Sequence, residues 1–212
     1  MLIPAAGTGE RLGLGPKALL ELDGEPLLSW VSRKALQFSN DVIVAVPRGT
    51  GISYARFCPG CRVIEGGATR QESVALLAQE SAGKWLLITD AARPFATLGL
   101  YSAVLDAARD KGVAGAFLLS DVPVARIENN RVTQTLPSHE AGIFQLPQAF
   151  SRELLLALIA KARANNWQAQ STLELALRSG IEVGVVPGEK SNIKLTSLDD
   201  WRCAQHLTEL LH

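Results

Sequence analysis

Apolar and polar positions follow two different rhythms along this chain. Short runs of aliphatic and β-branched residues, bounded by Gly, Pro, Asn or Asp, are typical of buried strands. The runs that fit this pattern are Leu2–Ala6, Val42–Pro47, Arg62–Glu65, Trp85–Thr89, Gly115–Leu119 and Glu182–Pro187. We therefore expect a strand in each of these segments.

The longer stretches between these runs carry apolar residues at helical spacing. In the stretch that begins at Ser151, Leu154, Leu158 and Ile159 fall on one face, and Ser151 is placed to cap its start. Helices are expected at Pro26–Phe38, Thr69–Ala82, Leu98–Lys111, Ser151–Asn165, Thr172–Ser179 and Leu198–Leu211. Strands that alternate with helices predict an α/β fold, in which helices cover both faces of a mostly parallel sheet.

The segment Asp121–Thr135 interrupts this alternation. A polar turn at Glu128–Asn130 lies between two runs that contain β-branched residues, which predicts a β-hairpin. Because a two-stranded hairpin is only marginally stable alone, it has to pack against something, and a second subunit is one candidate. The length of 212 residues otherwise predicts a single domain, residues 1–212.

The composition is that of an ordinary globular protein without a charge bias. Lys plus Arg and Asp plus Glu each number 21, so a non-specific nucleic-acid binder is not expected. The longest strictly apolar run, Leu154–Ala160, is far shorter than the ~20 residues of a membrane span. The first predicted strand begins at Leu2 and leaves no room for a signal peptide, so we expect a cytoplasmic protein with reduced thiols.

The first predicted strand runs into a glycine-rich loop, in the sequence LIPAAGTGERLGLGPK. Glycines let backbone amides approach an anion closely, and Arg11 and Lys17 add two cations to the same loop. A Walker A loop requires Ser or Thr after the lysine, whereas Ala18 follows Lys17. The dinucleotide fingerprint of a nicotinamide dehydrogenase requires a glycine where Leu12 stands. The loop therefore predicts phosphate binding of another kind.

Two further clusters follow predicted strands. The sequence EGGATRQESV, residues 65–74, fits a capped helix start, because Thr69 is a good N-cap and Glu72 its capping-box partner. The sequence ITDAARPF, residues 88–95, places Asp90 at the carboxyl end of a strand, where open α/β sheets bind ligands. Taken alone, each cluster is also explained by helix capping or by a solvated turn.

Together with NIKLT at residues 192–196, these motifs occur in the order and approximate spacing of one known family. The chain resembles the cytidylyltransferases that join CTP to 2-C-methyl-D-erythritol 4-phosphate in the non-mevalonate isoprenoid pathway. The resemblance covers essentially the whole chain, and the TRQxSV and DAARP elements are its most specific parts. It implies a Rossmann-like three-layer nucleotidyltransferase fold with a β-arm, here residues 121–135, that embraces the partner of a homodimer. The implied reaction transfers CMP from CTP to the polyol phosphate and releases pyrophosphate.

The resemblance also implies roles for particular residues. The implied CTP site consists of Pro4, Ala5, Ala6, Gly7, Thr8, Gly9, Gly67, Ala68, Arg70 and Ser73. Arg11 and Lys17 are expected to stabilise the triphosphate in the transition state, and Lys194 to orient the two substrates. Asp90 is expected to lie beside Mg²⁺ and the acceptor. Arg93 and Asp121 are expected on the acceptor side.

The acceptor side departs from the family's pattern. The family carries threonines at positions 122 and 146, an arginine donated across the dimer at 138, and a threonine-aspartate-aspartate run from 170. Here these positions are Val122, Leu146, Ser138 and Gln170. Loss of one bidentate arginine–phosphate contact costs roughly 1.5–3 kcal/mol. Two alternatives therefore stay open: another polyol phosphate as acceptor, such as a pentitol phosphate, or a CTP-binding protein with a degenerate acceptor site.

The cysteines offer one further candidate site. Cys58 and Cys61 form a CxxC pair, and Cys203 and His206 lie at i and i+3, so together they make a Cys₃His set suited to structural zinc. We do not favour zinc, because the two halves lie far apart in the sequence and the resembled family has no zinc there. A redox-active pair is not favoured either, because a strand rather than a helix is predicted after Cys61.

Overall fold

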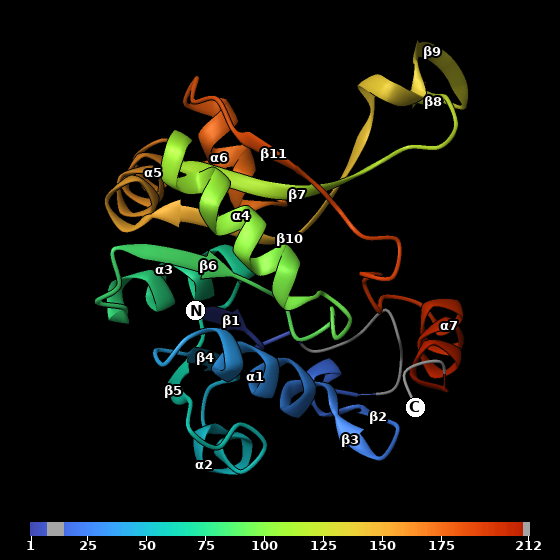
Figure 1. Cartoon of the computed structure of the whole chain (residues 1–212). Helices are drawn as coiled ribbons and strands as arrows, with labels where there is room; N and C mark the ends of the chain where they lie inside the picture. The colour runs from blue at the N-terminus through green and yellow to red at the C-terminus, as the bar shows by residue number, and fades with distance from the viewer. Residues whose placement is uncertain (8–14, 210–212) are drawn as a thin grey trace.

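The computed structural model describes residues 1–7 and 15–209 of the chain (Figure 1). Within these residues, seven strands form one sheet in the order β11-β7-β10-β6-β1-β4-β5. They are β1 (Leu2–Pro4), β4 (Ile43–Val46), β5 (Arg62–Glu65), β6 (Trp85–Ile88), β7 (Val113–Leu119), β10 (Gly142–Ser151) and β11 (Gly184–Pro187). Only β10 runs antiparallel to its neighbours in this sheet, so the expected mostly parallel sheet is confirmed.

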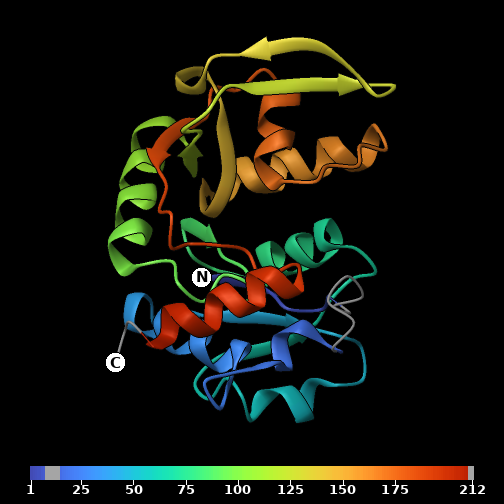
Figure 2. The same cartoon turned by 90° about the vertical axis from the view of Figure 1, so that its right-hand side faces the viewer.

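Helices cover both faces of the sheet. Successive residues of a strand point to opposite faces, so Leu2 packs in the cluster that includes α3, α5 and α6, whereas Ile3 packs with α1, α2 and α4. The helices are α1 (Leu27–Phe38), α2 (Gly51–Ala55), α3 (Arg70–Glu80), α4 (Leu98–Lys111), α5 (Arg152–Ala164), α6 (Thr172–Arg178) and α7 (Leu198–Glu209). Figure 2 shows α4 on one side of the sheet and α3, α5 and α6 on the other, which makes three layers.

Every strand and helix expected from the apolar pattern is present, with ends that differ by a few residues; the expected end of the last helix, Leu211, lies outside the described residues. The pattern missed β10, α2, and a small ribbon of β2 (Glu21–Leu22) and β3 (Glu25–Pro26). It also missed two 3₁₀ turns, η1 (Lys17–Leu19) and η2 (Ser138–Glu140). β10 carries Gly142 and Pro147 and lacks an alternating pattern, which argues against a strand in sequence terms.

The expected hairpin is formed by β8 (Val124–Glu128) and β9 (Arg131–Leu136). Asn129 and Asn130 have φ of 51° and 60°, the left-handed conformation that a two-residue hairpin turn requires. Figures 1 and 2 show the hairpin standing away from the sheet, beyond the end of β7. Ile127 and Val132 face each other across it and are 67% and 63% exposed. Apolar side chains of the hairpin therefore stay uncovered in one chain.

The carboxyl ends of the parallel strands meet at one edge of the sheet. β10 begins at that same edge, because Gly142 pairs with Leu119 at the end of β7. α7 packs beside the β2–β3 ribbon through a small cluster that contains Leu22, Leu195 and Ala204, and Figure 1 shows it there. Among residues 1–7 and 15–209, no helix has the length and apolar character needed to cross a bilayer.

Candidate active site

A cavity of about 450 Å³ opens at the carboxyl edge of the sheet, where β1, β5 and β6 end. It lies where open α/β sheets bind their ligands. Its described lining residues are Pro4, Ala5, Ala6, Gly7, Lys17, Ala18, Gly67, Ala68, Thr69, Arg70, Ser73, Asp90, Ala91, Ala92 and Lys194. Most of the residues that the sequence singled out for nucleotide binding and catalysis are thus brought to one cavity.

The first wall is the end of β1 and the turn that carries Lys17. The Ala5 N–H donates to Ala45 O at 2.7 Å, which extends the β1–β4 pairing to the cavity mouth. Lys17 begins η1, whose turn is closed by the Leu20 N–H donating to Lys17 O at 3.2 Å. Three expected site residues, Thr8, Gly9 and Arg11, lie outside the described residues.

The second wall is the turn from β5 into α3. The Gly67 N–H donates to Ser73 Oγ at 3.1 Å, and the Ala68 N–H donates to Glu72 Oε2 at 2.8 Å. Thr69 Oγ1 in turn accepts from the Glu72 N–H at 3.1 Å, which is the expected capping arrangement. Helix capping and a cavity wall are therefore two properties of the same turn.

The Gly67 position admits no side chain. A Cβ built there would lie 2.3 Å from Glu72 Cβ, far inside van der Waals contact. Glycine is therefore required for the main chain to follow the wall of the cavity this closely.

The floor of the cavity carries Asp90, which follows β6. Its Oδ1 accepts from the Ala92 N–H at 3.0 Å, and its Oδ2 lies 3.3 Å from Lys194 Nζ. Burial opposes ionisation of Asp90, but the charges of Lys194 and Arg70 and the Ala92 N–H outweigh it and lower the pKa of the carboxyl. Asp90 is thus held as a carboxylate between two cations.

Arg70 links this floor to α6. Its Nη1 lies 3.3 Å from Thr172 Oγ1, and burial lowers the pKa of its guanidinium while the charge of Asp90 opposes that shift. With Lys17, Arg70 and Lys194 against Asp90, the described lining carries more cations than carboxylates. This balance suits an anionic ligand such as a nucleoside triphosphate.

The two residues expected on the acceptor side lie outside this lining. Arg93 is 7% exposed, and its Nη1 and Nη2 donate to Asn192 O at 2.6 Å and to Phe144 O at 3.2 Å, while its Nε has no hydrogen-bond partner among residues 1–7 and 15–209. Asp121 is exposed just beyond β7 and forms an ion pair with Lys190, with Oδ2 and Nζ 2.7 Å apart. Both residues lie at the same sheet edge as the cavity, on the side of β7 and β10.

The four positions that depart from the family pattern are spread over the same side. Val122 is 64% exposed and precedes β8, and Ser138 begins η2 beyond β9. Leu146 is buried within β10 and its carbonyl accepts from Asn192 Nδ2 at 2.6 Å. Gln170 is exposed ahead of α6.

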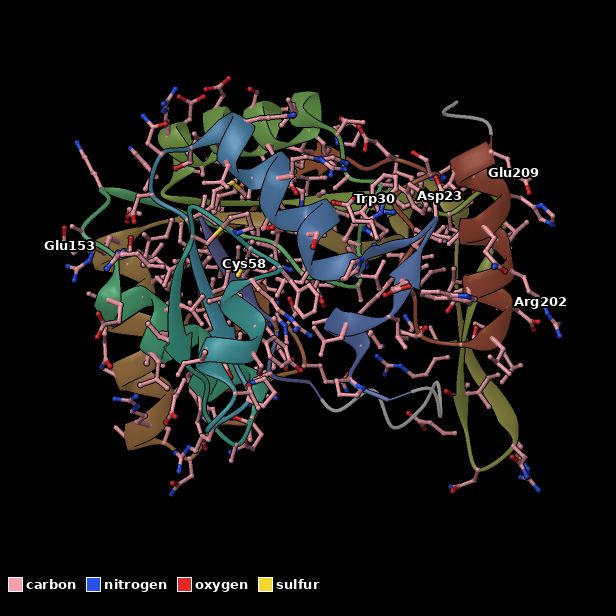
Figure 3. All side chains as sticks on the ribbon, turned by 90° about the horizontal axis from the view of Figure 1, so that it is seen from below. Asp23, Trp30, Cys58, Glu153, Arg202 and Glu209 are labelled. Carbon is pink, nitrogen blue, oxygen red and sulfur yellow. The ribbon has the colours of Figure 1, made fainter. Side chains whose placement is uncertain are left out.

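The cysteines do not assemble a metal site. Among residues 1–7 and 15–209, no three His, Cys, Asp or Glu side chains are grouped to hold a metal ion. Cys58 is buried at the end of the α2 segment, and Figure 3 shows it well away from α7, which carries Cys203 and His206. The structure therefore does not bring Cys58 together with Cys203 and His206.

The sequence did not single out Ala18, Ala91 and Ala92 as lining residues, and it named Thr69 only as a helix cap. It also missed Gln145 and Asn192, two buried amides that hold the segment leading to Lys194. Asn192 carried a signal, because it begins the NIKLT motif. Gln145 carried one too, because it begins the QLPQ sequence that stands where the resembled family has glutamine-threonine-proline-glutamine, but only Leu146 of that sequence was singled out.

A three-layer α/β fold with a cationic cavity at the carboxyl edge of its sheet is the architecture expected of a Rossmann-like nucleotidyltransferase. Comparison with known proteins is consistent with this class. The model of the IspD family, 2-C-methyl-D-erythritol 4-phosphate cytidylyltransferase, matches residues 1–209. Among curated relatives, the enzyme of that name from Deinococcus radiodurans is 39% identical over 98% of this chain and 88% of its own length. That from Thermus thermophilus is 36% identical over 99% of this chain and 97% of its own length.

Solved structures agree. The crystal structure of the Thermus thermophilus enzyme superposes with a TM-score of 0.84 at 33% identity, covering 98% of this chain and 97% of that one. A structure titled 4-diphosphocytidyl-2C-methyl-D-erythritol synthase, from Anaerococcus prevotii, has a TM-score of 0.87, and at 23% identity it supports the fold alone. The chain belongs to the IspD family and is a CTP-dependent nucleotidyltransferase.

Proposed function

We propose that this protein transfers CMP from CTP to 2-C-methyl-D-erythritol 4-phosphate, giving the CDP-linked alcohol and pyrophosphate. The observation that carries the proposal is the single cavity that gathers Lys17, the Gly67–Ser73 turn, Asp90 and Lys194 at one sheet edge. The names of the relatives favour this acceptor over a pentitol phosphate, and a purely CTP-binding protein is not favoured.

In this reaction a phosphate oxygen of the acceptor attacks the α-phosphorus of CTP in line. The new P–O bond forms as the bond to the β-phosphate oxygen breaks, and pyrophosphate leaves with that electron pair. Lys17 and Arg11 neutralise the charge that develops on the triphosphate. Lys194, held by Asp90 at 3.3 Å, brings the two anionic substrates together.

The nucleotide occupies the side of the cavity formed by β1 and β5. Pro4, Ala5, Ala6 and Gly7 continue from β1 into the phosphate-binding loop, to which Thr8 and Gly9 also belong. On the other wall, Gly67, Ala68, Arg70 and Ser73 surround cytosine and ribose. Because a Cβ at Gly67 would meet Glu72, glycine there keeps the turn in the conformation that places the Gly67 and Ala68 main chain at this wall.

The acceptor occupies the side of β7 and β10, beyond Asp90. Arg93 and Asp121 lie there, and Arg93 Nε is a buried donor without a hydrogen-bond partner in the described part of the chain. With Val122, Ser138, Leu146 and Gln170 at the departing positions, the acceptor is held by a set of contacts that differs from the family's. The substrate itself remains the one named by the relatives.

Mg²⁺ fits the donor set of the cavity. Mg²⁺ is usually held by one or two carboxylates together with substrate phosphates, and Asp90 offers one ionised carboxylate at the cavity floor. When bound, the ion would neutralise charge on the α- and β-phosphates of CTP. Asp90 is the residue of this chain that would hold it.

The functional unit is proposed to be a homodimer of single-domain chains, joined through the β8–β9 arm. Ile127 and Val132 on the arm are exposed and apolar, and only a partner surface would cover them. A cytoplasmic location follows from the proposed substrates, because CTP is a highly charged metabolite that is made and used inside the cell.

The first test is pyrophosphate release from CTP, Mg²⁺ and 2-C-methyl-D-erythritol 4-phosphate, with ATP and GTP in place of CTP as controls. Turnover that depends on both CTP and this acceptor supports the proposed function. Turnover with a pentitol phosphate but not with 2-C-methyl-D-erythritol 4-phosphate would show that the acceptor is a different polyol phosphate. CTP binding without any turnover would support a CTP-binding protein with a degenerate acceptor site.

A further inference from the structure

Lys194 is carried by a segment without regular secondary structure. The chain leaves β11 at Pro187 and enters α7 at Leu198, and the residues between them, 188–197, contain neither helix nor strand. No sheet or helix hydrogen bonds therefore fix the main chain on which Lys194 stands. Its position has to come from other contacts.

Glu189 is held through its carboxylate by Thr97 at the start of α4, and through its main chain by one side chain of β10. Gln145 Nε2 donates to Glu189 O at 2.9 Å, and Gln145 Oε1 accepts from the Glu189 N–H at 3.0 Å. The side-chain amide thus pairs with both main-chain groups of one residue, as a neighbouring strand would. The same Nε2 also lies 3.2 Å from Asn192 O.

Gln145 lies in a stretch of β10 whose pairing with β7 is irregular. The register between β10 and β7 shifts between Phe144 and Gln148, which is the kind of irregularity that re-aims side chains next to active sites. Gln145 lies within this shift, and its side chain bonds to the segment that follows β11.

Asn192 forms the next set of hydrogen bonds along the segment toward the cavity. It is fully buried, its Nδ2 donates to Leu146 O at 2.6 Å, and its own carbonyl accepts from Arg93 Nη1 at 2.6 Å. On the far side of Lys194, the Leu195 N–H donates to Ala92 O at 2.9 Å. Lys194 therefore lies between two residues that are hydrogen-bonded to the rest of the fold, Asn192 and Leu195. Gln145 contributes to the hydrogen bonds of Asn192.

We propose that Gln145 is a positioning residue for Lys194, acting through Glu189 and Asn192 rather than by touching a substrate. The inference rests on the proposed function for its kinetic consequence. Gln145 is 4% exposed, and hydrogen bonds in such surroundings are strong when complete and costly when broken. Removing its amide would let the segment 188–194 move while leaving the walls of the nucleotide site in place.

Gln145→Met tests this, because methionine keeps the length of the side chain and removes its donors and acceptor. Gln148→Met is the matched control: Gln148 lies on the same strand and is 3% exposed, and its Nε2 donates to Ser171 Oγ at 2.9 Å and to the main-chain carbonyl of Gln145 at 3.5 Å, not to the segment 188–197. Two readouts are compared. One is kcat and KM in the pyrophosphate assay, and the other is hydrogen–deuterium exchange of peptides that cover residues 188–195.

In Gln145→Met we expect kcat to fall about tenfold, with KM for CTP within twofold, and exchange at 188–195 to accelerate; Gln148→Met should show neither change. In a Lys194→Ala background, Gln145→Met should cost less than twofold further. Unchanged exchange at 188–195, or an equal loss of kcat in both backgrounds, would overturn the proposal.

If Gln145→Met does not fold, Gln145→Glu, which keeps the acceptor for Glu189, is put through the same comparisons. A wild-type protein without turnover would overturn the proposed function alone, and the exchange data would then decide the positioning role.

Discussion

Lys194 Nζ lies 3.3 Å from Asp90 Oδ2, so a cation from an irregular segment meets a carboxylate at the end of a central strand. Asp90 is 15% exposed and Lys194 37% exposed, which places the pair at the boundary between the core and the cavity. Lys17 and Arg70 line the same cavity and add two further cations to this one carboxylate and lysine. The cavity therefore keeps a positive balance where the triphosphate is proposed to bind.

Replacing Lys194 by methionine should raise the pKa of Asp90. Lys194 is the strongest of the groups that lower this pKa, and burial, which raises it, remains in the variant. The carboxyl ¹³C shift of Asp90, followed as a function of pH by NMR, measures the change. Lys190→Met is the control, because Lys190 pairs with Asp121 instead. An Asp90 titration that is identical in wild type and Lys194→Met would contradict the electrostatic role given to this lysine.

Lys17→Ala should lower kcat by 100-fold or more, which equals roughly 2.7 kcal/mol of transition-state stabilisation. Lys17 lines the cavity at the start of η1, where the triphosphate is proposed to lie. Steady-state pyrophosphate release measures the loss, with Lys84→Ala as the control, since Lys84 is exposed just before β6 at the opposite edge of the sheet. A Lys17→Ala enzyme with near-normal kcat would remove Lys17 from the catalytic machinery.

The sequence predicted most of the fold because its main signals are local. β4 is buried along its whole length and α5 is amphipathic, so a continuous apolar run and a helical stripe were enough to find them. β10 could not be found in this way. It pairs with β6 and β7, which come before it in the chain, and its Pro147 and paired glutamines are accommodated by those neighbours rather than by local preference.

The same distinction applies to the candidate site. Lys17, Gly67 and Asp90 belong to motifs that follow predicted strands. In an α/β fold the carboxyl ends of parallel strands share one edge of the sheet, so the sequence predicted that these residues lie together there. The contacts of Arg93 did not follow, because its guanidinium is committed to carbonyls of β10 and of the segment before Lys194. Such tertiary hydrogen bonds leave no periodic trace in the sequence.

Gly67→Ala should weaken CTP binding, with KM for CTP raised about tenfold. The added Cβ would lie 2.3 Å from Glu72 Cβ, which is anchored to α3 and cannot give way as the far end of a flexible side chain would. The turn would have to move, and with it the Gly67 and Ala68 amides at the cavity wall. Gly51→Ala, where a Cβ meets nothing within 4 Å, is the control. An unchanged KM for CTP would place the nucleotide away from this turn.

The double variant Ile127→Asp with Val132→Asp should convert a dimer into a monomer. The two side chains are directly paired on one face of the arm and exposed in a single chain, so charges there would oppose burial against a partner. Sedimentation velocity measures the change, and Gln134→Asp is the control, because exposed Gln134 pairs with Arg126, whose side chain lies on the opposite face of β8 from Ile127. A double variant that still sediments as a dimer would remove this face of the arm from the interface.

Asp200→Asn should destabilise the fold by roughly 0.5–1 kcal/mol near neutral pH, through loss of a helix cap. Asp200 Oδ2 accepts from the Thr196 and Ser197 N–H groups, both at 2.8 Å, and the Asp200 N–H donates back to Ser197 Oγ at 3.2 Å. Burial opposes the shift, but hydrogen bonds to this carboxylate from the Thr196 hydroxyl, at 2.7 Å, and from the Thr196 and Ser197 N–H groups lower the pKa of Asp200 from 3.8 to about 2. A pKa that is lower in the folded than in the unfolded chain stabilises the fold above the unfolded value, and this contribution is lost as the pH falls through the folded one. The stability difference between wild type and Asp200→Asn should accordingly be constant from neutral pH to about pH 4 and shrink toward pH 2.

Urea titrations at several pH values measure it, with Asp199→Asn as the control, since Asp199 is 88% exposed and pairs only with Arg202 among the described residues. A difference that stays the same down to pH 2 would show that the ionised Asp200 carboxylate does not cap α7.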